Sequence, residues 1–297
     1  MGSPPKRPTK KTTKAPASKA PAAKKTARKT RRKKAPPEPG SKGPAGLASR
    51  SKPALAKKAA ENKAAKAAAV RKKAKADAAA KKPVPEFLVD GPASAERTLI
   101  LAHGAGSPMD SPFLEEIAKG VAGYGFRVIR FEFPYMKKQR DTGKKVPPDK
   151  EATLLARWKK VIKKHGGPRG MIIGGKSLGG RMASLIADDL GVDGLVCLGY
   201  PFHPSGKSAK TRIGHLESLR TPTLIVQGER DAFGNRDEIR GYPLSWHIQV
   251  AYLTDGDHSF KPRKSAEVTE QDNMDEACRL VATFCRRPNL PPAPLVL

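Results

Sequence analysis

Apolar and polar residues alternate with two different periods in the part of the chain that follows residue 86. Short, nearly continuous apolar runs rich in β-branched residues are typical of strands buried on both faces, and they occur at 98–104, 127–134, 170–175, 194–201, 221–228 and 246–256. Longer stretches with an apolar residue every three or four positions are typical of helices with one buried face, and they occur at 111–125, 147–167, 181–191 and 270–287. This alternation predicts a mostly parallel sheet that is covered by helices on both faces.

Two local signals refine this pattern. Asp149 directly precedes the apolar period of the helix at 147–167, where a carboxylate can cap free backbone N–H groups, and we expect it to be the N-cap. Two long, polar, proline-containing stretches lie at 134–149 and 199–215. The stretch at 199–215 is predicted to form the rim of a pocket rather than a separate lid domain, and the stretch at 134–149 is predicted to be another loop near the same face.

The first 85 residues show neither period. They consist largely of Lys, Ala and Pro, contain no aromatic residue, and carry 27 basic against 3 acidic residues, a net charge of +24 out of the chain's +30. So little apolar surface cannot offset the conformational entropy that folding would cost. We therefore predict a disordered basic arm at 1–85, with partial helix at 54–82 where Pro and Gly are absent. One folded domain is predicted at 86–297.

An arm of this charge is expected to associate with polyanions. Because neutralising nucleic-acid phosphates releases counterions, the predicted partner of residues 1–82 is DNA or RNA, bound without regard to its sequence. In composition alone, the arm resembles the tails of linker-histone-like proteins. A solvated tail with no fixed partner and an arm that lies on an anionic membrane surface are the alternatives.

The spacing of the cysteines and the length of the apolar runs indicate the cellular compartment in which the protein is expected. No secretory signal fits the sequence, and no apolar run approaches the length of a transmembrane helix. The three cysteines, Cys197, Cys278 and Cys285, lack metal-ligand spacing, and the last two are too far apart along one predicted helix for a disulfide. We expect three buried thiols and a cytoplasmic protein, associated with the nucleoid in a bacterium or nuclear in a eukaryote.

A serine between two pairs of glycines joins the predicted strand at 170–175 to the next predicted helix. In the sequence GGKSLGG, the glycines two positions before and after Ser177 suit a sharp strand-to-helix turn, which crowds any Cβ at those positions. Such a turn exposes the serine hydroxyl at the carboxyl end of the sheet. A glycine-rich turn with an incidental serine is the plain alternative, and a P-loop is disfavoured by the spacing between the first glycine and the Lys-Ser pair.

A serine hydroxyl becomes a good nucleophile only when a base takes its proton and an acid orients that base. For a strand-turn-helix serine, the expected chain order is Ser, then Asp or Glu, then His. Asp231 follows the apolar run at 221–228, and His258 follows the run at 246–256, so both lie at carboxyl ends of strands. We predict that His258 is the general base and that Asp231 is its orienting acid. The competing acids nearby are Asp237, Asp255 and Asp257.

The sequence HGAG follows the first strong apolar run. The backbone N–H groups around Gly104 and Ala105, together with that of Leu178 directly after the serine, are the predicted oxyanion-hole donors, and no metal site is predicted. His103 is predicted to be structural, whereas His203 is a candidate for the pocket lining. Of the other histidines, His247 is predicted to lie in a strand, His215 in a loop and His165 at a helix end.

Six blocks of this sequence resemble, in the same order, a family of predicted α/β-hydrolases. They are LAHGAGSPMDSPFL, FEFPYM, GGKSLGGRMAS, LGYPFHP, TPTLIVQGERDAFG and DGDHSFKPRK. The family is related to dienelactone hydrolases and includes bacterial proteins, the testis-expressed-thirty proteins and the hydrolase-like part of the third subunit of the NSL histone-acetyltransferase complex. The resemblance covers about 87–287 and implies an α/β-hydrolase fold, a doubly wound, mostly parallel sheet without a large cap domain. It also implies that Ser177, Asp231 and His258 form a catalytic triad.

These residues predict a serine hydrolase of carboxylesterase or thioesterase type, which cleaves a small-molecule ester or thioester through an acyl-enzyme. The chemistry calls for no cofactor and no metal ion. Lys176 and Arg181 flank the serine and would attract an anionic acyl group, unless both face solvent or cap loops. The alternative function is a non-catalytic hydrolase-fold interaction module that associates with DNA or RNA.

Overall fold

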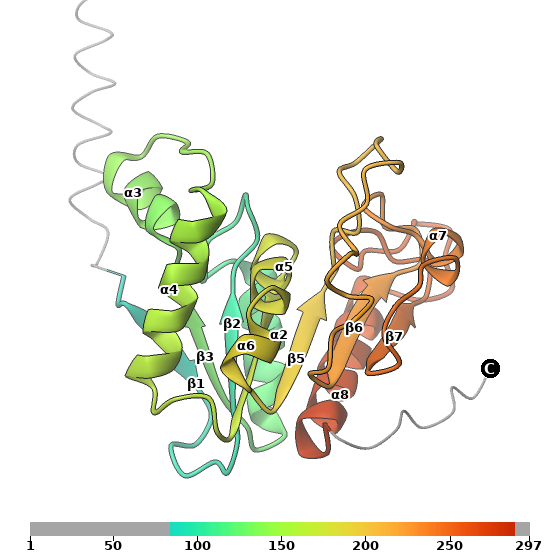
Figure 1. The fold of residues 1–297 in the computed structure, drawn as a ribbon. Helices are drawn as coiled ribbons and strands as arrows, with labels where there is room; N and C mark the ends of the chain where they lie inside the picture. The colour runs from blue at the N-terminus through green and yellow to red at the C-terminus, as the bar shows by residue number, and fades with distance from the viewer. Residues whose placement is uncertain (1–83, 289–297) are drawn as a thin grey trace, which may run out of the picture. The chain divides into compact units, whose positions relative to one another are not determined.

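The computed structural model describes residues 84–288. The predicted arm, apart from its last two positions, and residues 289–297 lie outside the described residues, and so does the helical stretch expected at 54–82. The described residues form one seven-stranded sheet with helices on both faces (Figure 1). The strands are β1 (Phe87–Asp90), β2 (Thr98–Ala102), β3 (Arg127–Phe131), β4 (Met171–Lys176), β5 (Gly194–Leu198), β6 (Thr223–Gly228) and β7 (Ile248–Leu253).

The strand order across the sheet is β1-β3-β2-β4-β5-β6-β7. Every neighbouring pair is parallel except β1 and β3, where Phe87 pairs with Phe131 in an antiparallel register. The mostly parallel sheet that the apolar runs predict is therefore confirmed. Because parallel strands all end at the same edge, the residues that follow β4, β6 and β7 are brought to one side of the sheet.

Helices cover the two faces of the sheet in separate groups. They are α2 (Pro112–Gly123), α3 (Pro134–Thr142), α4 (Glu151–Lys164), α5 (Leu178–Ser184), α6 (Ala187–Leu190), α7 (Arg236–Arg240) and α8 (Glu270–Arg286). In Figure 1, α2 and α8 lie behind the strands, whereas α4, α5 and α6 lie in front. Successive residues of a central strand therefore enter different cores: Cys197 of β5 belongs to the apolar cluster that contains Trp158 of α4, and Val196 belongs to the cluster that contains Val281 of α8.

The stretch at 134–149, which we expected to be a loop, contains a helix. Pro134 stands at the first turn of α3, and Gly143 ends it in the left-handed conformation with φ 65°, which is the usual placement of these two residues at helix ends. Asp149, the expected N-cap of α4, instead accepts a hydrogen bond from the Tyr135 N–H at 2.9 Å. The N-cap of α4 is Lys150, which makes no side-chain cap, so the carboxylate serves the neighbouring helix.

Three further differences lie in short elements. The helix predicted at 181–191 begins earlier, at Leu178, and is divided into α5 and α6 by Ile186, whose φ and ψ are −127° and −3°. The strand β1 and the five-residue α7 carry too little periodic signal to be predicted.

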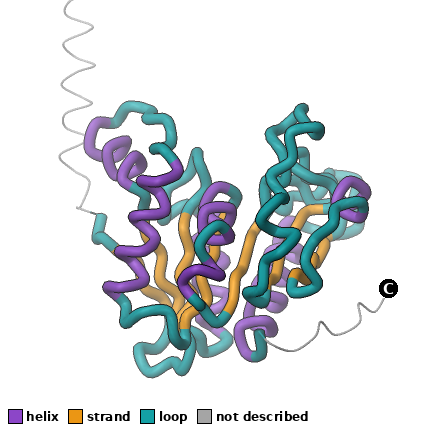
Figure 2. The backbone as a smooth tube through the Cα atoms, viewed as in Figure 1, coloured by secondary structure: helices purple, strands orange, loops and turns teal. Residues whose placement is uncertain are grey.

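The chain between β5 and β6, residues 199–222, contains no helix or strand (Figure 2), which agrees with the loop expected there.

Candidate active site

The turn between β4 and α5 has a strained backbone at its serine. Ser177 has φ 48° and ψ −109°, a combination that a residue with a Cβ rarely adopts. Its N–H donates to the Leu198 carbonyl of β5 at 3.0 Å, and its carbonyl accepts from the Arg181 N–H at 3.0 Å. The residue is therefore held between the strand and the first turn of the helix.

Two glycines make this turn possible. A Cβ on Gly175 would lie 2.2 Å from the Ala102 carbonyl oxygen, and one on Gly179 would lie 2.4 Å from the same atom. Both distances are far below a van der Waals contact, and the obstacle is backbone, which cannot rotate away. The glycines two positions before and after Ser177 thus let the turn pack against the end of β2.

Asp231 and His258 lie against each other at the same edge of the sheet. The Nδ1 atom of His258 and the Oδ2 atom of Asp231 are 2.7 Å apart. Asp231 follows β6 and is 0% exposed, whereas the imidazole follows β7 and is 24% exposed. The buried carboxylate accepts the Nδ1 proton, which leaves the lone pair of Nε2 available on the exposed side of the ring.

The carboxylate of Asp231 is held by a residue that the sequence reading missed. The fully buried Gln227 donates from its amide nitrogen to Asp231 Oδ2 at 2.9 Å and to the Gly234 carbonyl at 3.0 Å. The same nitrogen donates to the Tyr200 carbonyl at 3.2 Å, and the Gln227 amide oxygen accepts from the Tyr200 N–H at 2.8 Å. The signal was present, because Gln227 is a polar residue that ends an otherwise apolar run.

The competing acids have other partners. Asp255 forms salt bridges with Arg230 at 2.8 Å and Arg263 at 2.6 Å, and hydrogen bonding from Arg263 lowers the pKa of Asp255 to about 2. Asp257 accepts backbone N–H groups within its own turn, the shorter at 2.7 Å. Asp237 lies on α7 with its side chain 92% exposed. Asp231 is the one of the four that contacts the imidazole.

His258 and the residue that precedes Ser177 both approach Gly199, which directly follows β5. A Cβ on Gly199 would lie 3.3 Å from His258 Nδ1 and 2.8 Å from the Nζ atom of Lys176, the residue that precedes the serine. Within residues 84–288, the Ser177 hydroxyl has no hydrogen-bond partner. Hydrogen bonds between catalytic groups often tighten only when substrate binds, so this geometry is compatible with a serine-histidine pair.

The loop after β2 brings backbone N–H groups beside the serine. A Cβ on Gly104 would lie 3.8 Å from the Ser177 Cβ. The Gly104 carbonyl accepts from His103 Nδ1 at 2.7 Å and from the Tyr135 hydroxyl at 3.3 Å. Because a trans peptide points its N–H away from its carbonyl, the Ala105 N–H faces the opposite way from these two donors. The Leu178 N–H is the first of α5 and has no preceding helical turn to bind.

Comparison with known proteins agrees with this geometry. A family model described as an alpha/beta hydrolase domain matches residues 95–286. The chain belongs to the alpha/beta hydrolase family. The match spans every strand of the hydrolase except β1 and includes Ser177, Asp231 and His258.

Solved structures of other α/β hydrolases share the fold. An α/β serine hydrolase homologue from Coxiella burnetii is 18% identical, with a TM-score of 0.50 over 66% of this chain and 89% of that one. A dienelactone hydrolase from Anabaena variabilis is 18% identical, with a TM-score of 0.50 over 67% and 90%. A monoacylglycerol lipase from Paleococcus ferrophilus is 15% identical, with a TM-score of 0.51 over 68% and 98%. At these identities the likeness shows the fold alone.

The basic residues beside the serine follow the plainer of the two interpretations of the sequence, because Lys176 binds a backbone carbonyl of a loop and Arg181 pairs with a carboxylate. The Nζ atom of Lys176 donates to the His258 carbonyl at 2.5 Å instead of facing solvent or a substrate cleft. Arg181 pairs with Glu151 at 3.1 Å. Neither side chain of the hydrolase is therefore placed as an unpaired receptor for an anionic acyl group.

Three of the other histidines have hydrogen-bond partners of their own: His103, His203 and His215. His103 is buried, its Nε2 accepts the Phe133 N–H at 3.1 Å, and burial lowers its pKa. His203, a candidate for the pocket lining, is also buried and contacts Glu238 at 3.3 Å. His215 lies 2.8 Å from the Ser184 hydroxyl. His165 and His247 lie at the end of α4 and directly before β7.

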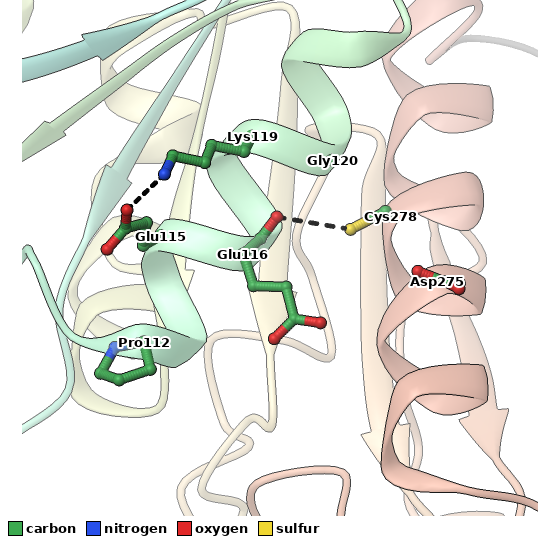
Figure 3. Close-up of a pocket in the computed structure, with 7 residues that line it drawn as sticks. All are labelled: Pro112, Glu115, Glu116, Lys119, Gly120, Asp275 and Cys278. Carbon is green, nitrogen blue, oxygen red and sulfur yellow. Dashed lines mark hydrogen bonds and ion pairs between the residues drawn. The ribbon is translucent and has the colours of Figure 1, made fainter.

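A cavity of about 440 Å³ lies between α2 and α8 (Figure 3), and Ser177, Asp231 and His258 are not among the residues that line it. It is lined by Pro112, Glu115, Glu116, Lys119, Gly120, Asp275 and Cys278. These helices cover the rear face of the sheet, whereas Ser177, Asp231 and His258 lie at its carboxyl edge, so this cavity does not belong to the candidate active site.

Three further features concern the cysteines, metals and membranes. All three cysteines are free and buried, as predicted. Among residues 84–288, no three His, Cys, Asp or Glu side chains are grouped as metal ligands would be. No helix in this same part of the chain is long and apolar enough to span a bilayer.

Proposed function

We propose that this α/β hydrolase is a serine hydrolase of carboxylesterase or thioesterase type, with Ser177 as nucleophile, His258 as general base and Asp231 as the orienting acid. The observation that carries the proposal is the 2.7 Å contact between buried Asp231 and partly exposed His258, beside a serine on a strained turn. A strained strand-to-helix turn that exposes a serine beside a histidine-carboxylate pair is the arrangement acyl transfer requires.

The proposed reaction proceeds through an acyl-enzyme. His258 Nε2 takes the Ser177 hydroxyl proton as the oxygen attacks the acyl carbon, and the imidazolium then gives that proton to the leaving alcohol or thiol. Asp231, fixed by Gln227 and the Phe233 N–H at 2.8 Å, stabilises the imidazolium. The N–H groups of Ala105 and Leu178 are the proposed oxyanion donors. Water activated by the same imidazole then releases the acid.

A covalent probe tests this assignment. A fluorophosphonate should label the unmodified protein and fail to label Ser177→Ala, whereas the matched variant Ser205→Ala, in an exposed loop, should label normally. Hydrolysis of a small activated ester should fall by several orders of magnitude in Ser177→Ala and in His258→Ala, because the triad acts as a unit. Equal labelling of Ser177→Ala and the unmodified protein would contradict the assignment. Absence of labelling in both would favour the non-catalytic interaction module.

We also propose a more specific subfamily for this chain and a role for its basic arm. The six sequence blocks support membership among the predicted hydrolases related to dienelactone hydrolases, the group of the testis-expressed-thirty proteins. The charge of residues 1–85 supports a basic arm, ahead of the hydrolase domain at 86–297, that tethers the enzyme to DNA or RNA in the nucleoid or nucleus.

Removal of residues 1–82 tests whether the arm contributes to DNA binding, to ester hydrolysis or to both. We expect the shortened protein to hydrolyse a soluble ester within about twofold of the full chain, because the triad lies elsewhere, while salt-dependent DNA binding is lost. A DNA titration at several salt concentrations, run beside the esterase assay, measures both properties. DNA binding that persists in the shortened protein would locate the nucleic-acid site in the hydrolase domain.

A further inference from the structure

Lys176 connects the serine turn to the turn that carries the histidine. It is the last residue of β4, and its Nζ atom donates to the backbone carbonyl of His258 at 2.5 Å. The end of β5 makes room for this contact, because a Cβ on Gly199 would lie 2.8 Å from Nζ and 3.1 Å from the same carbonyl oxygen. Gly199 also has φ 64°, so both its space and its conformation favour glycine.

The surroundings of this ammonium are largely apolar. It lies 5.3 Å from the centre of the Phe113 ring on α2 and 5.9 Å from that of Phe260, distances at which a cation is attracted to an aromatic face. The charged or titratable groups that face it are Asp231 from the loop after β6, and Asp257 and His258 from the loop after β7. Desolvation lowers the pKa of Lys176 to about 8, although the two carboxylates oppose the shift.

Such a group is unfavourable for the fold alone. Withdrawing an ammonium from water costs free energy that one carbonyl bond and two aromatic rings do not recover here, since the pKa is lowered rather than raised. An apolar side chain of the same length would fill this site at lower cost. The position of the ammonium at the catalytic turn accounts for a charge in this place.

We propose that Lys176 is a positioning residue, whose ammonium holds the backbone of His258 so that the imidazole stays between Asp231 and Ser177. This inference rests on the proposed serine-hydrolase function. The ring of His258 is fixed at Nδ1 by Asp231, and the Lys176 bond fixes the backbone of the same residue. Two anchors define the place of Nε2, where a displacement of about 1 Å can cost on the order of 100-fold in rate.

The test compares Lys176→Met, which removes the donor and the charge, with Lys176→Arg, which retains a donor that does not titrate. Lys119→Met is the matched control, because Lys119 is an exposed lysine of α2. With a small activated ester, we expect kcat of Lys176→Met to fall about tenfold or more at pH 7, with KM within about twofold. The Arg variant should recover part of kcat, and Lys119→Met should be unchanged.

The pH profile provides a second readout on the unmodified protein. An ammonium bonds a carbonyl more strongly than an amine does, so kcat should fall as the pH rises through about 8. This step should be absent from the Arg and Met variants. If Lys176→Met does not fold, the Arg variant and the alkaline step decide the question.

Four results would overturn the proposal. They are normal kcat in Lys176→Met, a loss confined to KM, an alkaline step that persists in Lys176→Arg, and a loss of Tm that parallels the loss of kcat in both variants. Loss of activity in Ser177→Ala together with full activity in Lys176→Met would reject this inference and leave the serine-hydrolase proposal standing.

Discussion

Replacement of Ser177 by glycine should stabilise the protein while abolishing its chemistry. At φ 48° and ψ −109°, a residue with a Cβ is strained by about 1–3 kcal/mol, whereas glycine adopts the mirror-image β region readily. Glycine also gains unfolded-state entropy, which lowers stability by about 0.4–1 kcal/mol. The hydroxyl has no hydrogen-bond partner among the described residues, so its loss adds little. With the middle of each range, the net gain is about 1.3 kcal/mol.

Ser177→Ala is the control, because alanine also lacks the nucleophile but keeps the Cβ and its strain. For a folded domain of roughly 200 residues, about 1 kcal/mol corresponds to a Tm shift of about 2–4 °C, so Ser177→Gly should melt about 3–5 °C above Ser177→Ala. Thermal and urea unfolding followed by circular dichroism measure the difference. A Tm for the glycine variant equal to or below that of the alanine variant would refute the assignment of strain to this turn.

Three further outcomes follow from contacts near the turn. Gly179→Ala places a Cβ 2.4 Å from the Ala102 carbonyl oxygen and should lower the free energy of unfolding, measured in urea, by about 1–3 kcal/mol. The control Gly123→Ala, where the added Cβ meets open space, should leave it nearly unchanged. Equal stabilities of the two variants would contradict the crowding at Gly179. Gln227→Leu removes three donor contacts and should lower both stability, by about 1–3 kcal/mol, and ester hydrolysis; unchanged hydrolysis would mean that the triad carboxylate needs no such support. Lys176 has a folded pKa of about 8, below its ordinary 10.5, so the unfolded state binds more protons between these values and wild-type stability rises with pH there. Lys176→Met should therefore have a higher Tm than the wild type at pH 7, and the difference should shrink above pH 8; a constant difference would argue against a desolvated ammonium.

The apolar pattern of the chain was sufficient to predict the architecture. Runs buried on both faces, separated by helical periods, leave few arrangements other than a parallel sheet between two helical layers, because each run must be covered twice. The turn at Ser177 could also be predicted from the local sequence, since its glycines are required by backbone crowding within a single strand-helix connection. Chain order and the common edge of parallel strands were enough to indicate Asp231 and His258.

Only the tertiary structure decided how the side chains around these residues are used. Asp149 carried a valid capping signal, but its carboxylate accepts the Tyr135 N–H in the first turn of α3 instead of capping α4. Gln227 and Lys176 acquire their partners from segments far away in sequence. Local periodicity records whether a residue is buried, but the identity of its polar partner depends on which chain segments the sheet brings together, and that is a property of long-range packing.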